Sequence, residues 1–186
     1  MKGFSIPQRA ELTPDNKDLF DRLTSMLGTV PNLYAGFAMS ANALRTYLAL
    51  ENGKSSLNAR QREVIHLIVS HVNDCKYCLT AHSEIARMNG FTEEQIREIR
   101  SGAATFDIQL DALVKLAKSI TENQGRSDEA ALNAFYSAGL SNENLVDLIL
   151  VIGHMIIANY LQALINTPLD FPLTADWEDS IRHREG

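Results

Sequence analysis

Helix start and stop signals recur from one end of this chain to the other. Three junctions place a capping side chain three residues before an amide side chain, as in a capping box: Asn58 with Gln61, Thr92 with Gln95 and, more loosely, Ser141 with Asn144. A helix-ending glycine precedes two of these junctions, at Gly90 and Gly139. No run of alternating β-branched residues bounded by turns indicates a strand. The sequence therefore predicts an all-α fold built from antiparallel helix hairpins.

These signals, together with the apolar spacing between them, predict about eight helices. The predicted helices cover about 14–28, 32–50, 58–72, 75–89, 92–101, 107–122, 127–138 and 141–166. Thr167-Pro168 then begins a predicted irregular tail over residues 167–186. A chain of 186 residues is within the usual range for one domain, so we predict a single helical domain over residues 1–186.

Composition and charge narrow the choice of partner and compartment. The chain is 45% hydrophobic with a net charge of -6, which argues against nucleic-acid binding because phosphates are neutralised by clustered Lys and Arg. We find no secretory signal and no apolar run near the roughly 18 residues of a membrane span, so a cytoplasmic protein is predicted. The segment from Leu145 to Ile157 is apolar almost all round. It predicts a central helix or a subunit interface, and therefore a homo-oligomer.

A weak internal similarity pairs the segment Leu57 to Tyr77 with the segment Leu140 to Tyr160. The pairing aligns His71 with His154, whereas Cys75 falls on Ala158. Internal duplication and the recurrence of the same helix start and stop signals both explain such a similarity. If the two similar helices pack together, His154 is expected in a pocket beside the thiols. His71 and Tyr77 are the other candidate pocket residues.

The two cysteines of the chain, Cys75 and Cys78, are only three residues apart. In an intracellular protein this spacing indicates redox chemistry or metal binding rather than a structural disulfide. Asn73 and Asp74 just before them are good N-cap residues, so both cysteines are predicted in the first turn of a new helix. Backbone N–H groups and the helix dipole lower the pKa of a thiol there and favour the reactive thiolate.

His82 follows Cys78 by four residues, which places the imidazole on the same helix face as both thiols. Histidine can accept a thiol proton, and a nearby carboxylate can orient its ring. Glu63 is the candidate carboxylate. Its position at the start of an apolar helix leaves a second interpretation open, a solvated acid that complements the helix dipole.

The spacing of these four residues resembles the core signature of AhpD-like alkylhydroperoxidases, in the carboxymuconolactone decarboxylase superfamily. Eleven residues separate Glu63 from Cys75, two separate Cys75 from Cys78, and three separate Cys78 from His82. The resemblance implies an AhpD-like helical bundle and a thiol-dependent peroxidase. It assigns peroxide attack to Cys78, disulfide formation to Cys75 and proton relay to His82 with Glu63.

The resemblance also implies partners. The substrate is a hydroperoxide, the electron donor is an external lipoyl-type or thioredoxin-like dithiol, and the assembly is a trimer or hexamer. No cofactor is expected, since the sequence has no glycine-rich phosphate loop. One departure is Tyr77, because the best-known peroxidase members have a histidine between the cysteines. A phenol with a pKa near 10 donates a hydrogen bond but is no base at neutral pH.

Two other interpretations stay open at the level of sequence. A zinc ion bound by Cys75, Cys78 and His82, with His71 or His66 as the fourth ligand, has suitable ligand types. Structural zinc more often joins two separated ligand pairs, whereas these three residues share one short helical segment. The second alternative is a non-enzymatic helical interaction or stress-related protein that keeps the motif without turnover.

Overall fold

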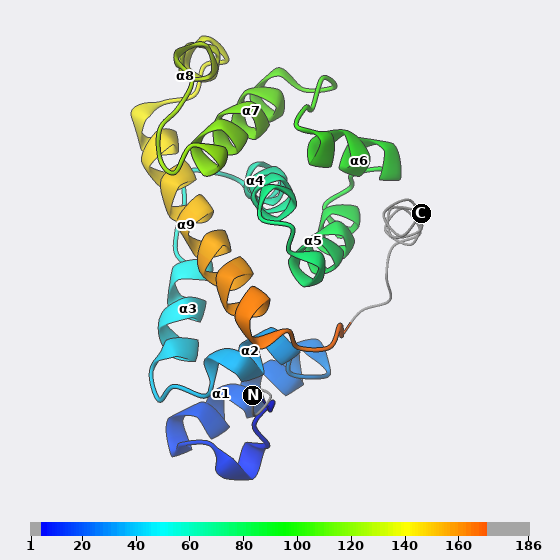
Figure 1. Ribbon diagram of the computed structural model, residues 1–186, viewed down its shortest axis with the longest axis vertical. Coiled ribbons are helices and arrows are strands. Elements are labelled where there is room, and N and C mark those ends of the chain that lie inside the picture. The colour runs from blue at the N-terminus through cyan, green and yellow to red at the C-terminus, as the bar shows by residue number, and fades with distance from the viewer. Residues whose placement is uncertain (1–4, 171–186) are drawn as a thin grey trace. The chain divides into compact units, whose positions relative to one another are not determined.

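The computed structural model describes residues 5–170, and within these residues the all-α prediction is confirmed (Figure 1). Nine α-helices and one short 3-10 helix occur in the described part of the chain, with no strand. These residues divide into two compact units, one of residues 5–54 and 160–170 and the other of residues 55–159. Each unit is described by itself. The single domain over residues 1–186 stays a prediction.

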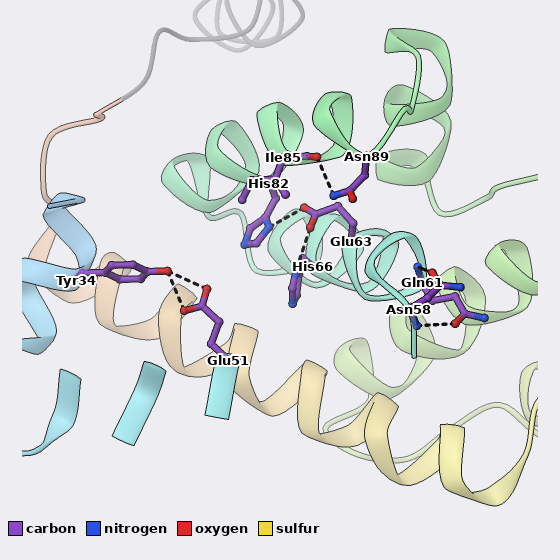
Figure 2. Close-up of polar contacts among 9 residues, drawn as sticks. All are labelled: Tyr34, Glu51, Asn58, Gln61, Glu63, His66, His82, Ile85 and Asn89. Atoms are coloured by element: carbon purple, nitrogen blue, oxygen red, sulfur yellow. Dashed lines mark hydrogen bonds and ion pairs between the residues drawn. The ribbon is translucent and has the colours of Figure 1, made fainter. Parts of the chain in front are cut away.

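The first unit consists of short helices that begin and end at clear local signals. Its elements are the 3-10 helix η1 (Arg9–Glu11), α1 (Pro14–Leu27), α2 (Asn32–Phe37), α3 (Ala43–Glu51) and the last turn of α9 (Asn142–Ile165). The Thr13 side chain caps α1 ahead of the proline at its first position, and Gly28 ends it at φ 79°. Between α2 and α3, the Tyr34 hydroxyl donates to the Glu51 carboxylate at 2.8 Å (Figure 2).

The predicted continuous helix over residues 32–50 is wrong, because the chain breaks between α2 and α3. A buried polar side chain stabilises the break. Asn16 of α1 is fully buried, and its amide donates to the carbonyls of Ala38 at 2.9 Å and Ser40 at 3.0 Å. Those carbonyls are outside the helical hydrogen-bond ladder, so a long-range side chain satisfies them instead.

The second unit is arranged around α4. Its helices are α4 (Ala59–Val72), α5 (Lys76–Met88), α6 (Glu93–Ser101), α7 (Ile108–Glu122), α8 (Glu129–Ser137) and the part of α9 up to Asn159. Helix α4 packs against α5, α6 and α7, and it buries most of its length (Figure 1). Helix α4 is therefore the centre of the group α4 to α7, and the central or interface position of the segment Leu145 to Ile157 stays a prediction.

The three predicted capping boxes are confirmed. Asn58 and Gln61 exchange side-chain to backbone hydrogen bonds of 2.9 and 3.0 Å at the start of α4 (Figure 2). Thr92 with Gln95 and Ser141 with Asn144 make the same reciprocal pairs before α6 and α9. These caps fix where α4, α6 and α9 begin, so the residues that follow on α4 enter the core in a defined register.

Helix α9 contradicts the expectation that no apolar run of the chain approaches the length of a membrane span. Its 24 residues include an 18-residue window with a mean hydropathy of 2.0, so by length and composition it could cross a membrane. Isolated polar residues such as Asp147 and Asn159 interrupt the run without lowering its average enough. Half of that window is buried, and one such helix is weak evidence for a membrane span, because the core helix of a soluble protein meets the same criteria.

The chain leaves helical structure after Ile165, as the predicted tail requires. Residues 166–170 contain no helix, and the Asp170 carboxylate accepts a 2.8 Å hydrogen bond from the backbone N–H of Asn32. The rest of the predicted tail, residues 171–186, lies outside the described residues. Exposed apolar side chains on α9, including Val146 and Ile157, are compatible with the predicted oligomer, which stays a prediction.

Replacing Asn16 by Ala should destabilise the first unit. The substitution removes the donor from the buried carbonyl of Ala38 and the partly buried carbonyl of Ser40, and such a loss costs about 1–3 kcal/mol. The matched control is Asn52→Ala, because Asn52 also donates to a carbonyl, that of Leu48, but at an exposed position. Urea unfolding followed by circular dichroism should show a clear loss for the Asn16 variant and little change for the control. Equal losses would contradict the role of burial.

Candidate active site

The turn between α4 and α5 positions the two cysteines. Helix α4 ends at Val72, and Asp74 adopts φ 51°, in the left-handed region. Cys75 itself is the N-cap of α5, where the prediction placed Asn73 or Asp74. The sulfur of Cys75 accepts the backbone N–H of Cys78 at 3.4 Å. The helix start was thus predicted within one residue, but the capping group is a thiol and not an amide or carboxylate.

The two sulfur atoms share one buried environment. Their Sγ atoms are 2.6 Å apart, both cysteines are free thiols, and only 6% of Cys75 and 2% of Cys78 is exposed. A hydrogen bond from the Cys78 thiol lowers the pKa of Cys75. The same bond, together with burial and the neighbouring charge, raises the pKa of Cys78. The pair is therefore organised to carry one negative charge, because a second would be buried beside the first.

Glu63 of α4 is a buried carboxylate at the centre of a histidine cluster (Figure 2). Only 4% of the residue is exposed, so the solvated-acid interpretation is wrong. Its Oε1 lies 2.7 Å from Nδ1 of His82, and its Oε2 lies 3.4 Å from Nδ1 of His66. Burial acts to raise the pKa of Glu63, but the charges and hydrogen bonds of the two histidines outweigh it and lower the pKa to about 2. Glu63 is ionised at neutral pH.

The ionised carboxylate fixes the tautomer of His82. A carboxylate only accepts hydrogen bonds, so Nδ1 of His82 carries the hydrogen that points to Glu63. In the neutral ring Nε2 is then the basic nitrogen. This is the arrangement in which an acid orients an imidazole and stabilises its charged form when the ring takes up a proton.

Two further histidines extend the cluster from α4 and α9. The ring of His66 lies 4.4 Å from that of His82 and 5.6 Å from that of His154, measured between centroids. Burial is the largest cause that lowers the pKa of both His66 and His154, the latter to about 3. His154 is therefore neutral at physiological pH. His154 therefore lies beside His66, and the sequence alignment of His154 with His71 is a separate matter that this contact does not test.

Asn159 of α9 is a site residue that sequence reasoning missed. It is 2% exposed and accepts a hydrogen bond from the Asn73 amide at 2.9 Å. Hydrogen bonding from its side chain lowers the pKa of Cys75. The sequence signal that could have indicated Asn159 is a side-chain amide within the strongly apolar segment of α9. A buried polar residue of this kind requires partners, and here they are at the cysteine turn.

The structure separates the remaining candidates. Tyr77 is 4% exposed and belongs to the core around the cysteines, whereas His71 is exposed near the end of α4. Among the described residues, the group with metal-ligand geometry is Glu63, His66 and His82, with ligand atoms within 4.8 Å of one another. The cysteines are not members of that group. Glu63, His66 and His82 are therefore a second candidate ligand set, and the zinc alternative at the cysteines stays a prediction.

Comparisons with known proteins agree with the sequence motif. The model of the carboxymuconolactone decarboxylase family matches residues 38–118, a segment that contains Glu63, both cysteines and His82. The AhpD core of an uncharacterized peroxidase-related protein from Ralstonia eutropha superposes with a TM-score of 0.78 at 19% identity, covering 94% of this chain and 93% of that one. The chain is therefore similar to the carboxymuconolactone decarboxylase family over residues 38–118, and it shares the AhpD-like helical fold.

Two further proteins are similar to this chain, one in sequence and one in fold. The uncharacterized protein YdfG of Bacillus subtilis is 28% identical over 104 residues, which are 55% of this chain and 71% of that protein. The debrominase Bmp8 superposes with a TM-score of 0.75 at 15% identity, covering 91% of this chain and 93% of that one. AhpD-like folds therefore include activities other than peroxide reduction, and the fold alone does not select the reaction.

Acid should destabilise this AhpD-like chain through His154. The pKa of His154 is about 3 in the folded chain and ordinarily about 6.5, so the unfolded chain takes up a proton first as the pH falls. The contribution of neutral His154 to the free energy of unfolding is complete above pH 6.5. It is lost as the pH falls toward 3, at up to about 1.4 kcal/mol per pH unit. Urea unfolding of metal-free protein at several pH values measures this slope. His154→Gln should reduce it, and an unchanged slope would refute the assignment.

Proposed function

We propose that this protein is a thiol-dependent, alkylhydroperoxidase-like peroxidase that reduces hydroperoxides through a dithiol-disulfide cycle of Cys75 and Cys78. Glu63 and His82 are proposed as the proton relay. The observation that carries the proposal is the buried 2.7 Å contact between an ionised Glu63 and Nδ1 of His82, on the helix that also bears the thiols. An orienting acid, an imidazole and an activated thiol are the parts that nucleophilic thiol catalysis requires.

The proposed reaction balances with the two thiols and one hydroperoxide. A thiolate attacks the O–O bond, forms a sulfenic acid and releases an alkoxide, which takes the proton held on His82 and leaves as an alcohol. The second thiol then displaces water from the sulfenic acid and closes the disulfide. Two electrons pass from the sulfurs to the peroxide, and an external dithiol must return them.

Cys78 is the proposed attacking residue, by resemblance to the superfamily motif, and Cys75 is the resolving residue. In the resting pair the helix N-terminus favours charge on Cys75, because Cys75 accepts the Cys78 N–H. Attack by Cys78 therefore requires its proton to move to Cys75 or to the relay. The 2.6 Å separation of the sulfurs allows the first transfer along an existing contact.

The remaining parts of the proposal rest on resemblance. A lipoyl-type or thioredoxin-like dithiol is the proposed reductant, and a homotrimer or homohexamer is the proposed assembly. The AhpD-like fold suggests a soluble protein, and a cytoplasmic location is proposed with it. Tyr77 supplies no base between the cysteines, so in this scheme the proton for the leaving alkoxide comes from His82.

Stoichiometric oxidation tests the proposed cycle directly. Reduced, metal-free protein is mixed with one equivalent of cumene hydroperoxide and analysed by intact mass and thiol titration. We expect the wild type to lose two hydrogens and both free thiols, and Cys75→Ser to accumulate a sulfenic acid at Cys78 that dimedone traps. Cys78→Ser should consume no peroxide. Unchanged peroxide consumption in Cys78→Ser would exclude catalysis by this site.

The relay is tested by a matched pair of histidine variants. His82→Gln removes the base beside Glu63 and should slow oxidation of the thiols by about 100-fold or more at pH 7. His71→Gln alters an exposed histidine on α4 and should react like the wild type. If both variants retain the wild-type rate, His82 is not the relay. Metal analysis of the protein as isolated addresses the zinc alternative, which one zinc per chain with no titratable thiol would establish.

A further inference from the structure

Asn159 connects three parts of the second unit at the cysteine turn. It lies on α9 and is 2% exposed. Its Oδ1 accepts from Nδ2 of Asn73 at 2.9 Å, and its Nδ2 donates to the hydroxyl of Ser70 at 3.3 Å. Ser70 is fully buried, and its carbonyl accepts the backbone N–H of Cys75 at 2.9 Å. The amide therefore contacts residues on the α4 side of the turn, within the network that holds Cys75.

These contacts fix the orientation of the Asn159 amide. Asn73 donates to the oxygen, so the oxygen of Asn159 is already used as an acceptor. The nitrogen has two hydrogens, and only one is needed for Ser70. The second hydrogen is available to a sulfur atom. A donor fixed in this orientation favours a thiolate over a thiol, because hydrogen bonding to the charged form stabilises it.

We propose that Asn159 is a positioning residue that stabilises the singly ionised state of the Cys75–Cys78 pair by donating its second amide hydrogen to the thiolate. The proposal deepens the proposed function by assigning part of the thiol activation to α9, outside the motif that runs from Glu63 to His82. Asn159 exchanges no proton and forms no bond to substrate. Its effect is to raise the fraction of reactive thiolate at neutral pH.

The directions of the thiol pKa values support this geometry. Hydrogen bonding from Asn159 acts to lower the pKa of Cys75 and also that of Cys78, although other effects raise the latter overall. The charge of His82 lowers the pKa of Cys75 as well. The titratable groups around the pair are His82 on α5, Glu63 and His66 on α4, His154 on α9, and Asp74 and Lys76 beside Cys75.

Thiolate formation in the full-length, reduced, metal-free protein tests the proposal without any peroxide. The rate of alkylation by iodoacetamide is measured from pH 5 to 10, with thiolate absorbance at 240 nm as a second readout. Asn159→Leu keeps the approximate volume and removes the donor. We expect its alkylation midpoint to rise by about one to two pH units, since a hydrogen bond to a charged group is removed. Asn159 would then set thiol reactivity.

Two more variants make the outcome decisive. Asn142→Leu alters another asparagine of α9, which accepts from the Tyr136 hydroxyl at an exposed position, and should keep the wild-type midpoint. Asn73→Ala frees the Asn159 amide to rotate and should raise the alkylation midpoint by less than Asn159→Leu does. This variant tests the proposal if Asn159→Leu does not fold. Wild-type midpoints in the folded Asn159 and Asn73 variants overturn the proposal. A raised midpoint without peroxide reduction in the wild type would refute the proposed function and retain the role of Asn159.

Discussion

Glu63 keeps a negative charge at a position where almost none of the residue reaches solvent, and the neighbouring residues satisfy that charge. A buried carboxylate would ordinarily be protonated, so its ionisation requires partners that more than offset desolvation. Two imidazoles provide them, one from the next turn of α4 and one from α5. The charge in turn sets the orientation of His82. Removal of Glu63 would leave the imidazole of His82 buried without its partner.

Helix packing makes this arrangement possible. Glu63 enters the core because the capping box at Asn58 starts α4 in the required register, and α4 is enclosed by α5, α6 and α7. The left-handed backbone conformation of Asp74 reverses the chain over a few residues. Helix α5 therefore returns beside α4, with Cys75 as its N-cap. A site made of two adjacent helices joined by so short a turn has little freedom to separate, which keeps its hydrogen bonds aligned.

Local signals in the sequence predicted most of the helices and the placement of Cys75, Cys78 and His82 along one short segment, because both depend on short spacings. Capping pairs lie three residues apart, and the cysteines and His82 lie within one helix. The missed features depend on contacts between distant segments. Asn16 stabilises the break at residues 38–42 from another helix, and Asn159 reaches the cysteine turn from α9. Periodicity reports which face of a helix is apolar but not which buried polar side chains meet across the core.

The reactivity of the cysteine pair therefore cannot be inferred from its spacing alone. The N-terminus of α5 stabilises negative charge on Cys75, and the nearby Cys78 thiol limits the pair to one charge. His82 adds a positive charge when it is protonated, and the Glu63 carboxylate stabilises that protonated form. Each contribution comes from a different element, and α9 adds Asn159. AhpD-like folds with different reactions can differ in these surroundings while they keep the same helices, because thiolate fraction and proton supply are set by the neighbours of the sulfur atoms.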